Sequence, residues 1–392
     1  MMIRVSVRVA HIITSLHGDG AQRMLYRVAA AAPLATCDLQ HVVISLEAGG
    51  EMSRDFEKRG IPVYELGMAR RMPSLKNIKT LQDIMKTERP SIIQGWMYHG
   101  NVVASLSKLF HSDAKLFWNI RRCVYDLRDD HFFTRQTIRL NAALSRFTDR
   151  IIYCAQLAAD QHEHIGFTPR NRVVIPNGFN TERFTPLPGA RSRLCEQLKI
   201  DTDTLIVGNV GRFHPQKDHE TLLQAFAQVK AQCPKVHLVC VGREMTSENA
   251  VLSSWMRTLG IETSVSLLGV RADIPQLMSG FDIYCSSSVN EGFPNVLGEA
   301  MACGIPVVST DVGASGEMLD GLSPVVPRRD AEALARVVCE VIAMSSEKRA
   351  LLGEQAREKV LKHYSLERVV AMYQDLYTAS EAGTNQETNL QV

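Results

Sequence analysis

Short apolar runs alternate with amphipathic stretches along almost the whole chain, and this alternation limits the possible fold more than any other feature. The runs of the first half are residues 5–13, 41–46, 61–66, 91–95, 115–120, 150–154 and 173–175. Those of the second half are residues 204–210, 237–241, 265–268, 282–286, 307–309 and 323–326. Such alternation is typical of βαβ crossovers, which build parallel sheets. Because 392 residues exceed what one core usually supports, the sequence predicts an α/β fold of two Rossmann-like domains in tandem.

A break in the periodicity predicts where the two domains meet. The segment from Pro186 to Gly189 interrupts the pattern, and a polar, charged stretch follows it up to about residue 198. We therefore expect a first domain over residues 1–185 and a second over residues 186–364. Helices are expected over residues 347–362 and 366–380, and the polar tail over residues 381–392 is expected to be disordered.

Charge is distributed unevenly between the two halves. Residues 1–185 carry 25 Lys or Arg against 17 Asp or Glu, a net charge of +8, and the rest carry 19 against 25, a net charge of −6. Two basic clusters could attract an anionic membrane surface or a phosphate-bearing acceptor. The first consists of Arg70, Arg71, Lys76 and Lys79, and the second of Arg135, Arg139, Arg146 and Arg150. Plain solvated helix faces are the alternative. We expect no nucleic-acid partner, because no binding motif accompanies the charge.

The cysteines and the N-terminal segment predict a cytoplasmic protein. The nine cysteines, at positions 37, 123, 154, 195, 233, 240, 285, 303 and 339, show no Cys-x-x-Cys spacing and lie mostly in apolar runs, so we expect reduced core residues. Arg4 and Arg8 interrupt the first apolar run, which predicts no secretory signal, and no run reaches the roughly 18 residues of a membrane span. Peripheral contact at the inner face of the cell membrane is compatible with this prediction.

Two carboxylates lie eight residues apart where a loop runs into a short helix. Glu291 is in the loop, where Gly292 and Pro294 disfavour helix, and Glu299 is in the apolar helix that follows. The backbone amides of residues 293–296 therefore lie at a helix N-terminus, which favours an anionic ligand. A carboxylate beside that terminus can accept hydrogen bonds from hydroxyl groups. The pattern suits a sugar attached to a phosphate.

A longer pattern surrounds these glutamates and resembles the retaining glycosyltransferases of family 4, which have the GT-B fold. Glu299 is followed directly by Ala300-Met-Ala-Cys-Gly-Ile-Pro-Val-Val308, as in the donor-site signature of that family. Residues 174–186 resemble the segment that leads out of the first domain, and residues 211–218 resemble the diphosphate loop. Each piece alone is usually surface or a turn. Their common order at the ends of predicted strands favours a site, because open α/β sheets bind ligands there.

The resemblance implies transfer of a sugar, with retention, from a nucleotide-diphosphate sugar to a glycan or lipid-linked acceptor, in bacterial surface polysaccharide assembly such as lipopolysaccharide or capsule. Arg212 and Lys217 would stabilise the leaving diphosphate, so we expect no metal and no cofactor. Glu291 would hold donor sugar hydroxyls and Glu299 the ribose. The other donor contacts implied are Gly292, Phe293, Pro294, Asn295 and Val296, with backbone near Val270 and Arg271 framing the base.

In the first domain, the resemblance implies acceptor and donor contacts after three predicted strands. Gly18 and Gly20 resemble a glycine-rich loop through which backbone approaches the donor phosphate or the acceptor, although Asp19 and Gln22 depart from the family pattern. His99 resembles the histidine that approaches the donor sugar and is counted with Arg212, Lys217 and Glu291 as catalytic. Arg121 and Arg122 follow the next predicted strand, and we expect one of them to contact a phosphate on the donor or the acceptor, so both are counted as acceptor-binding. The family's last helix, here residues 365–380, crosses back to the first domain, with a buried face of Val369, Val370, Tyr373 and Leu376.

Alternative interpretations stay open at this point. Asp201-Thr-Asp203 has the form of a metal-binding motif but precedes its strand, so we interpret it as a turn, and His162-Glu-His164 as a polar helix face. A sugar-nucleotide epimerase or a phosphorylase could share the fold, and a catalytically silent subunit that binds nucleotide sugars could share the donor site. The sequence does not show which base, which donor sugar or which acceptor the protein recognises.

Overall fold

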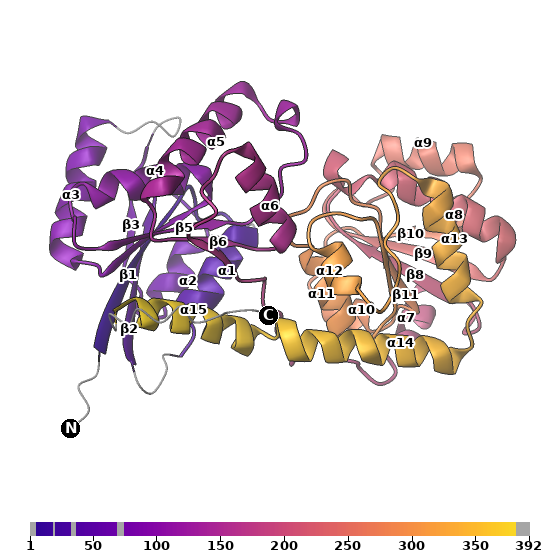
Figure 1. The fold of residues 1–392 in the computed structure, drawn as a ribbon. Helices are drawn as coiled ribbons and strands as arrows, with labels where there is room; N and C mark the ends of the chain where they lie inside the picture. Colours follow the sequence, from indigo (N-terminus) through magenta and orange to yellow (C-terminus); the bar gives the residue numbers. More distant parts are fainter. Residues whose placement is uncertain (1–4, 19, 33–36, 69–73, 382–392) are drawn as a thin grey trace. The chain divides into compact units, whose positions relative to one another are not determined.

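Both halves of the chain form parallel sheets, as the sequence predicts. The computed structural model describes residues 5–18, 20–32, 37–68 and 74–381. Residues 382–392 of the tail expected over residues 381–392, and Arg70 and Arg71 of the first basic cluster, therefore lie outside the described residues. The chain divides into two compact units (Figure 1). Unit 1 comprises the chain up to Gly178 and the chain from Glu367 onward, and unit 2 comprises Phe179–Leu366.

Unit 1 contains a seven-stranded sheet in the order β3-β2-β1-β4-β5-β6-β7. Its strands are β1 (Val5–Ile13), β2 (Cys37–Ser45), β3 (Val63–Glu65), β4 (Ile92–Trp96), β5 (Lys115–Ile120), β6 (Arg150–Tyr153) and β7 (Arg172–Val174). β1 pairs with β2 on one side and with β4 on the other, so the direction of winding reverses between β1 and β4. Open α/β sheets bind ligands beyond the carboxyl ends of the strands at such a switch point.

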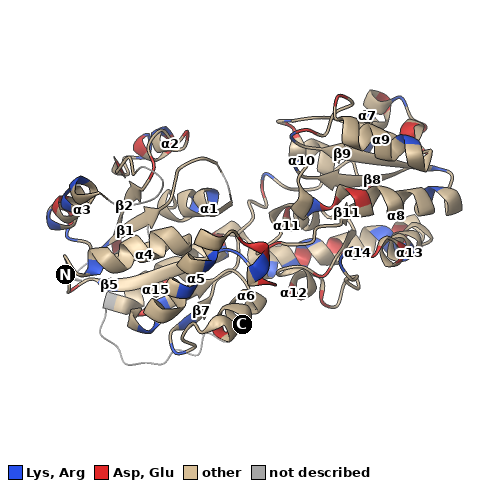
Figure 2. Cartoon of the chain, turned by 90° about the horizontal axis from the view of Figure 1, so that it is seen from above, with Lys and Arg blue, Asp and Glu red and all other residues tan. Residues whose placement is uncertain are grey.

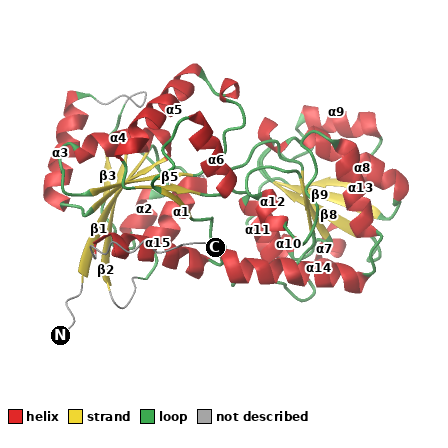
Figure 3. Ribbon diagram, viewed as in Figure 1, coloured by secondary structure: helices red, strands yellow, loops and turns green. Residues whose placement is uncertain are grey.

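Helices cover both faces of this sheet (Figures 1 and 3). One face carries α3 (Leu75–Glu88), α4 (Met97–Lys108), α5 (Phe132–Leu144) and α6 (Gln156–Ile165), and the other carries α1 (Gly20–Ala29), α2 (Ser53–Glu57) and α15 (Leu366–Glu381). Although α15 comes from the end of the chain, its side chains join the core that α1 forms with β1 and β2. All four residues expected on its buried face, Val369, Val370, Tyr373 and Leu376, are buried.

A pair of buried histidines lies between this sheet and α15. The Trp96 indole N–H donates to Nδ1 of His11 at 3.1 Å, and Nε2 of His11 lies 2.9 Å from Nδ1 of His41. His11 therefore accepts at one ring nitrogen and donates from the other, which requires both rings to be neutral. Burial, and then the charge of the neighbouring ring, lowers the pKa of His11 well below its usual value, and burial lowers the pKa of His41 to about 4.

Acidification from about pH 6.5 to about pH 4 is expected to destabilise unit 1. In this range His41 binds a proton in the unfolded chain but not in the folded one, so it reduces the free energy of unfolding by up to about 1.4 kcal/mol per pH unit. The lowered pKa of His11 acts in the same direction. The stability is complete above about pH 6.5 and is lost as the pH falls. Urea unfolding, followed by the fluorescence of Trp96 and Trp118, measures it.

The variant His41→Leu should lose part of this pH dependence, whereas the exposed His164→Gln should keep all of it. Equal slopes of unfolding free energy against pH in the wild type and both variants would contradict the neutral histidine pair.

Unit 2 contains a five-stranded sheet in the order β10-β9-β8-β11-β12. Its strands are β8 (Leu205–Val210), β9 (Val236–Val241), β10 (Val265–Leu267), β11 (Ile283–Ser286) and β12 (Val307–Ser309). One face carries the core formed with α8 (His219–Gln232), α9 (Ala250–Leu259) and α13 (Ala331–Ile342). The other helices are α7 (Ala190–Leu198), α10 (Ile274–Met278), α11 (Asn295–Ala302), α12 (Ser315–Leu319) and α14 (Ser346–Lys359). In this unit the switch point lies between β8 and β11.

The strand predicted over residues 323–326 is wrong. The structure has only an isolated bridge between Thr310 and Val326 there. The Val326 N–H donates to the Ser309 carbonyl, and the Asp311 N–H donates to the Val326 carbonyl. Pro324 and Pro327 lack N–H groups on either side of these bonds, so a longer ladder cannot form.

The chain enters unit 2 earlier than the break at Pro186 suggests. Phe179 is buried, lies 6.1 Å from the Phe293 ring and donates its N–H to the Tyr364 carbonyl at 2.9 Å. These contacts already belong to unit 2, so the junction falls between Gly178 and Phe179 instead of between residues 185 and 186. Proline and glycine mark a turn that lies inside the unit and not at its edge.

The cysteines that the structure describes are free thiols. Cys123, Cys154, Cys195, Cys240, Cys285 and Cys303 are buried, and Cys233 and Cys339 are partly exposed. Burial raises the pKa of Cys285 and Cys303 to about 12. Across residues 5–18, 20–32, 37–68 and 74–381, none of the helices combines the length and the apolar character needed to cross a membrane.

Candidate functional site

The candidate donor site of unit 2 lies at its switch point. The loop that follows β8 carries Arg212 and Lys217, and the loop that follows β11 carries Glu291. β8 and β11 are neighbours in the sheet, so their carboxyl ends lie side by side. The fold thus brings together two segments 74 residues apart in the chain.

Lys217 and Glu291 form an ion pair across these two loops. Lys217 Nζ lies 2.5 Å from Oε1 of Glu291, and the side chains are 27% and 18% exposed. The same carboxylate oxygen accepts a hydrogen bond from the Ser288 hydroxyl at 3.1 Å. The Ser287 hydroxyl donates to the Lys217 carbonyl at 2.9 Å, so the backbone of Lys217 is held independently of its side chain. A cation and a carboxylate are therefore held ready beside each other, partly shielded from water.

Aromatic packing fixes the start of α11. Phe293 is buried against Phe179 and Tyr364, with ring centroids 6.1 and 5.7 Å away. A Cβ added at Gly298 would lie 2.1 Å from the Phe179 ring, so only glycine allows α11 to approach this closely. Pro294 is the N-cap residue and supplies no side-chain cap. The first-turn amides of α11 lack intrahelical acceptors and form the kind of helix terminus that binds anions.

Buried Tyr284 places the two glutamates in one neighbourhood. Burial, and after it the negative charge of Glu291 and, more weakly, of Glu299, raises the pKa of Tyr284 well above its usual value. Both carboxylates therefore act on the same phenol beneath the site. Glu299 is partly exposed on α11, one helical turn beyond Asn295 and Val296, which are also partly exposed.

The cationic side of the site includes Arg243, which the sequence analysis missed. Burial, and then the positive charges of Arg212, Lys217 and Arg243, lowers the pKa of His214. Arg243 lies two residues beyond the end of β9 and is exposed, as Arg212 is. The Phe213 N–H donates to the Arg243 carbonyl, which holds the two loops together. The position of Arg243 near the end of a strand, directly after Gly242, is a sequence signal that could have identified this residue.

The turn after β10 holds the residues expected to frame the base. Val270 is 76% exposed, and Arg271 forms two short hydrogen bonds, of 2.8 and 2.6 Å, to the carboxylate of Asp273. The Arg271 side chain is thereby held by its own turn, so an incoming base would meet the apolar Val270 and the backbone. The role of this turn stays a prediction.

In unit 1, the loop of Gly18 and Gly20 leads from β1 into α1. The Gly18 N–H donates to the Glu51 carboxylate at 3.1 Å, and Nε of Arg23 donates to the Gly18 carbonyl at 2.8 Å. A Cβ at Gly18 would lie 2.8 Å from the same carboxylate oxygen, so glycine allows this approach. Gly20 is exposed at the start of α1. Asp19, between them, lies outside the described residues.

His99 lies in the first turn of α4, beyond the end of β4. The turn is tight, because Met97 has a φ of 61°, a left-handed backbone that is rare outside glycine. A Cβ added at Gly100 would lie 2.4 Å from the Ile12 carbonyl, so α4 approaches β1 closely. His99 therefore lies beyond the carboxyl end of β4, at the switch point of unit 1.

Both candidate acceptor arginines hold other parts of unit 1. Arg121 donates to the Ile175 carbonyl at 2.9 Å, to the Tyr373 hydroxyl at 3.1 Å and to the Asn177 side chain. Arg122 binds both carboxylate oxygens of Asp130, at 2.9 and 3.1 Å. The contacts of Arg121 tie the end of β5 to the end of β7 and to α15. Binding of a phosphate by either residue stays a prediction, and it would have to compete with these bonds.

Two segments with the form of metal sites have other roles. Asp203 pairs with Lys235 in a turn before β8, as expected for a turn. His162 is buried, with Nε2 2.8 Å from the Tyr98 hydroxyl and Nδ1 2.6 Å from the Ala158 carbonyl, so the polar helix face predicted there is wrong for this residue. Within the described ranges, no three His, Cys, Asp or Glu side chains are grouped to hold a metal ion.

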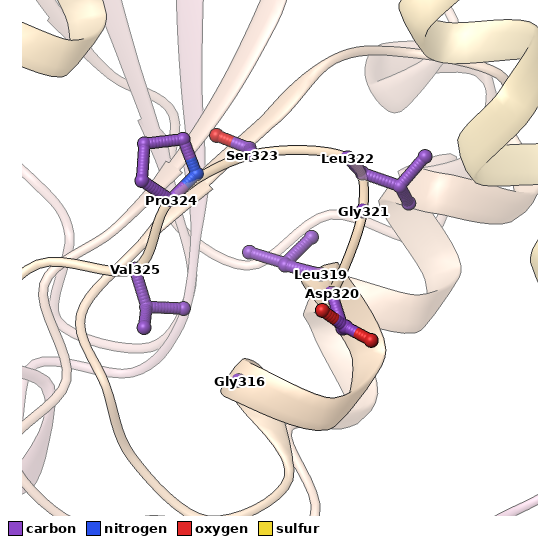
Figure 4. A pocket seen from close by; sticks show the side chains of 8 residues that line it. All are labelled: Gly316, Leu319, Asp320, Gly321, Leu322, Ser323, Pro324 and Val325. Atoms are coloured by element: carbon purple, nitrogen blue, oxygen red, sulfur yellow. The ribbon is translucent and has the colours of Figure 1, made fainter.

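A cavity of about 440 Å³ lies elsewhere in unit 2, at the end of α12 (Figure 4). It is lined by Gly316, Leu319, Asp320, Gly321, Leu322, Ser323, Pro324 and Val325, and none of the residues predicted for the donor site borders it. Its lining contains one carboxylate and no cation, which does not suit a diphosphate. We therefore place the candidate site at the ends of β8 and β11.

Two family models match the two units in order. The model of Glycosyltransferase Family 4 matches residues 18–183, and the model of Glycosyl transferases group 1 matches residues 204–344. The chain belongs to the family 4 glycosyltransferases. The second match covers every strand of unit 2 and the loops of Lys217 and Glu291, so the resemblance on which the sequence analysis relied is confirmed.

Curated relatives of this glycosyltransferase differ in their named roles. It is 34% identical over 143 residues to the putative glycosyltransferase EpsF of Bacillus subtilis, covering 36% of this chain and 37% of that protein. It is 31% identical over 233 residues to D-inositol 3-phosphate glycosyltransferase of Corynebacterium jeikeium, covering 54% of each. With the lipopolysaccharide core biosynthesis glycosyltransferase LpsE of Rhizobium meliloti it shares 30% identity over 235 residues, covering 59% and 64%. The glycosyltransferase thus matches about half the length of these relatives.

Solved structures show the fold of the glycosyltransferase. Anabaena Alr3699/HepE in complex with UDP matches 95% of this chain and 100% of its own, with a TM-score of 0.82 and 23% identity. A glycosyltransferase from Rickettsia africae matches 97% and 100%, with a TM-score of 0.79 and 19% identity. The predicted GT-B fold, with two Rossmann-like domains, is confirmed.

Proposed function

We propose that this glycosyltransferase moves a sugar, with retention of anomeric configuration and without a metal ion, from a nucleotide-diphosphate sugar to a hydroxyl of a glycan or lipid-linked acceptor. The observation that carries the proposal is the Lys217–Glu291 pair at the switch point of unit 2, beside the N-terminus of α11. The pair offers one group for a phosphate and one for hydroxyls. A nucleotide-diphosphate sugar contains both side by side.

Several findings support the donor and acceptor classes. Alr3699/HepE has structures with UDP and with UDP-glucose, and it shares the fold. Two of the relatives are named for D-inositol 3-phosphate and for lipopolysaccharide core biosynthesis, names that fit an acceptor that carries phosphate or belongs to a glycolipid. Bacterial surface polysaccharide assembly is the setting we propose.

The reaction needs charge stabilisation more than a protein nucleophile. The bond from the anomeric carbon to the diphosphate oxygen breaks, the acceptor oxygen bonds to the same face of that carbon, and the acceptor proton passes to the departing phosphate oxygen. Arg212 and Lys217, with Arg243 nearby, would stabilise the negative charge that develops on the diphosphate. The first-turn amides of α11 would contribute further to the stabilisation of this negative charge. Glu291, fixed by Ser288, would hold the sugar hydroxyls.

The remaining groups would position the two substrates. Glu299 would accept hydrogen bonds from the ribose hydroxyls, and the backbone at Val270 and Arg271 would frame the base. His99 would donate or accept a hydrogen bond at the sugar from the switch point of unit 1. Gly18 and Gly20 would let backbone approach the donor phosphate or the acceptor.

Replacement of Glu299 by alanine is expected to weaken nucleotide binding more than turnover. The carboxylate lies one turn into α11 and would contact the ribose, which does not react, so it binds ground state and transition state alike. Calorimetric titration with nucleoside diphosphate should show about a tenfold or larger loss of affinity, with the rate at saturating donor nearly unchanged. Glu354→Ala, on exposed α14, is the matched control. A fall in turnover with unchanged affinity would refute the assignment.

The proposal as a whole is tested by a screen of nucleotide sugars in the presence of a chelator. The wild type and the double variant Arg212→Ala/Lys217→Ala are heated with UDP-, GDP-, ADP- and TDP-sugars. A ligand at about 100 times its dissociation constant should stabilise by roughly 2.7 kcal/mol, which raises the unfolding temperature by a few degrees. The shift should appear with one nucleotide series and disappear in the double variant. NMR of the product then reads the anomeric configuration.

Rival activities give different products in the same screen. An epimerase would change or release the sugar without an acceptor, and a phosphorylase would form a sugar phosphate from free phosphate. A silent subunit would show the thermal shift but no turnover with any acceptor. No shift with any nucleotide sugar would remove the main support for the proposal.

A further inference from the structure

One face of α5 presents large apolar side chains to solvent. Phe133, Leu140 and Phe147 follow one another at intervals of seven residues and are 81%, 46% and 63% exposed. Residues seven apart on a helix lie almost above one another. The 3-10 turn Ser145–Phe147 continues α5 with right-handed backbone, so the third member stays close to this line. The three side chains form one apolar row on the surface of unit 1.

A second row beside it begins with an aromatic residue and continues with arginines. Phe132, Arg139 and Arg146 repeat the same interval one position earlier, and all three are exposed. The Arg146 guanidinium lies over the Phe147 ring, 5.1 Å from its centroid, which places charge directly beside the apolar row. The helix itself contains no Asp or Glu (Figure 2). We call the two rows together the α5 face.

Neighbouring carboxylates do little to neutralise the α5 face. Before the helix, Asp126 binds Arg128, and Asp130 binds Arg122. After it, the Asp149 carboxylate accepts the N–H of Leu116. Asp129 is exposed but lies before the first turn of the helix. The basic charge of the face therefore stays available to an anionic partner.

We propose that the α5 face docks on an anionic lipid bilayer, with the apolar row inserted between head groups and the arginines on lipid phosphates. Aromatic and aliphatic side chains on one line with cations beside them are the arrangement by which helices lie in a membrane interface. An apolar row that lies beside a row containing arginines fits a flat surface on which lipid phosphates lie above the hydrocarbon. Phe133 and Phe147 are too exposed to belong to the core of unit 1.

The opposite face of α5 connects this surface to the candidate site. Buried Asn141 donates to the Tyr98 carbonyl at 3.1 Å, in the same turn of α4 that carries His99. One helix diameter, about 10 Å, thus separates the bilayer from that turn. If the acceptor is lipid-linked, its head group would be delivered close to His99, and this last point alone rests on the proposed function.

The test uses the full chain and two kinds of vesicle. One is pure phosphatidylcholine, and the other contains about one third phosphatidylglycerol, which gives the negative surface potential of a bacterial membrane. Co-sedimentation should show binding to the anionic vesicles only, weakened by salt. Phe133→Ser/Phe147→Ser should abolish binding, and Arg139→Gln and Arg146→Gln should each weaken it about fivefold. Leu351→Ser and Arg336→Gln, exposed in unit 2, should leave it unchanged.

A second measurement distinguishes insertion from adhesion. Phe133→Trp should show a blue-shifted emission and quenching by brominated lipid chains when anionic vesicles are added. Circular dichroism confirms that each variant is folded, and Leu140→Ser replaces the double variant if that one is not. Binding that the α5 variants do not change, absence of binding to both vesicles, or an unquenched tryptophan would each overturn the proposal. Loss of self-association in the α5 variants without vesicle binding would indicate a second copy of the chain as the partner instead.

Discussion

Replacement of Lys217 by methionine is expected to lower the rate of sugar transfer by about 10²-fold or more and to leave the fold almost unchanged. The ammonium group is the cation that the structure holds at the switch point of unit 2, 2.5 Å from Glu291 and only 27% exposed. Charge that develops on a leaving diphosphate would be stabilised there more strongly than in water. Methionine keeps the length and the apolar stem but removes the charge.

The stability of Lys217→Met should change by about 1 kcal/mol or less, because a partly exposed ion pair contributes little. The Ser287 hydroxyl holds the backbone of residue 217 through its carbonyl and is not affected by the change. Lys348→Met, on an exposed part of α14, is the matched control and should keep full activity. Transition temperatures and kcat under saturating donor give the comparison.

A readout independent of activity comes from His214. The positive charge of Lys217 is among the causes that lower the pKa of His214, so the pKa should rise in Lys217→Met and stay unchanged in Lys348→Met. NMR titration, with the signal assigned through His214→Gln, measures it. A pKa that does not move, together with full activity, would show that Lys217 lies away from the site in solution.

The sequence predicted the strands well where apolar residues alone define them. Residues 115–120 and 307–309 match β5 and β12, because these strands are almost wholly buried and are rich in apolar residues. The run over residues 323–326 also ends in two valines, yet Pro324 within it and Pro327 after it leave it with a single bridge. Hydrogen-bonding capacity, and not hydrophobicity, separates the two cases.

Pairing in the site depended on information that the sequence does not display. Lys217 and Glu291 were each expected at the end of a strand, but their ion pair requires β8 and β11 to be neighbours, which local patterns cannot show. Arg121 is similar, because its partner Tyr373 is 252 residues away on α15. His162 was expected on a polar face, and the hydroxyl of Tyr98 makes a buried position possible instead. In each case a contact between distant segments decides the role of the side chain.

Replacement of Gly313 by alanine is expected to lower sugar transfer by about 10²-fold while a matched glycine replacement does not. Gly313 follows β12 with a φ of 55°, and a Cβ there would lie 2.5 Å from the Gly292 carbonyl oxygen and 2.7 Å from the Glu291 carbonyl oxygen. Both oxygens belong to the loop that presents the Glu291 carboxylate, so the loop must move. A displacement of about 1 Å in a catalytic constellation can cost that factor in rate.

The matched control is Gly321→Ala, which separates backbone strain from displacement of the loop. Gly321 has a φ of 75°, but nothing lies within 4 Å of the Cβ that alanine would add. Left-handed backbone costs an alanine roughly 1–2 kcal/mol, so both variants should lose at least this much unfolding free energy. Only Gly313→Ala should also lose donor binding and turnover, because only its methyl group meets the Glu291 loop. Equal activity in the two variants would mean that the loop can shift without affecting catalysis. The close approach of Gly313 would then not be what keeps Glu291 in position.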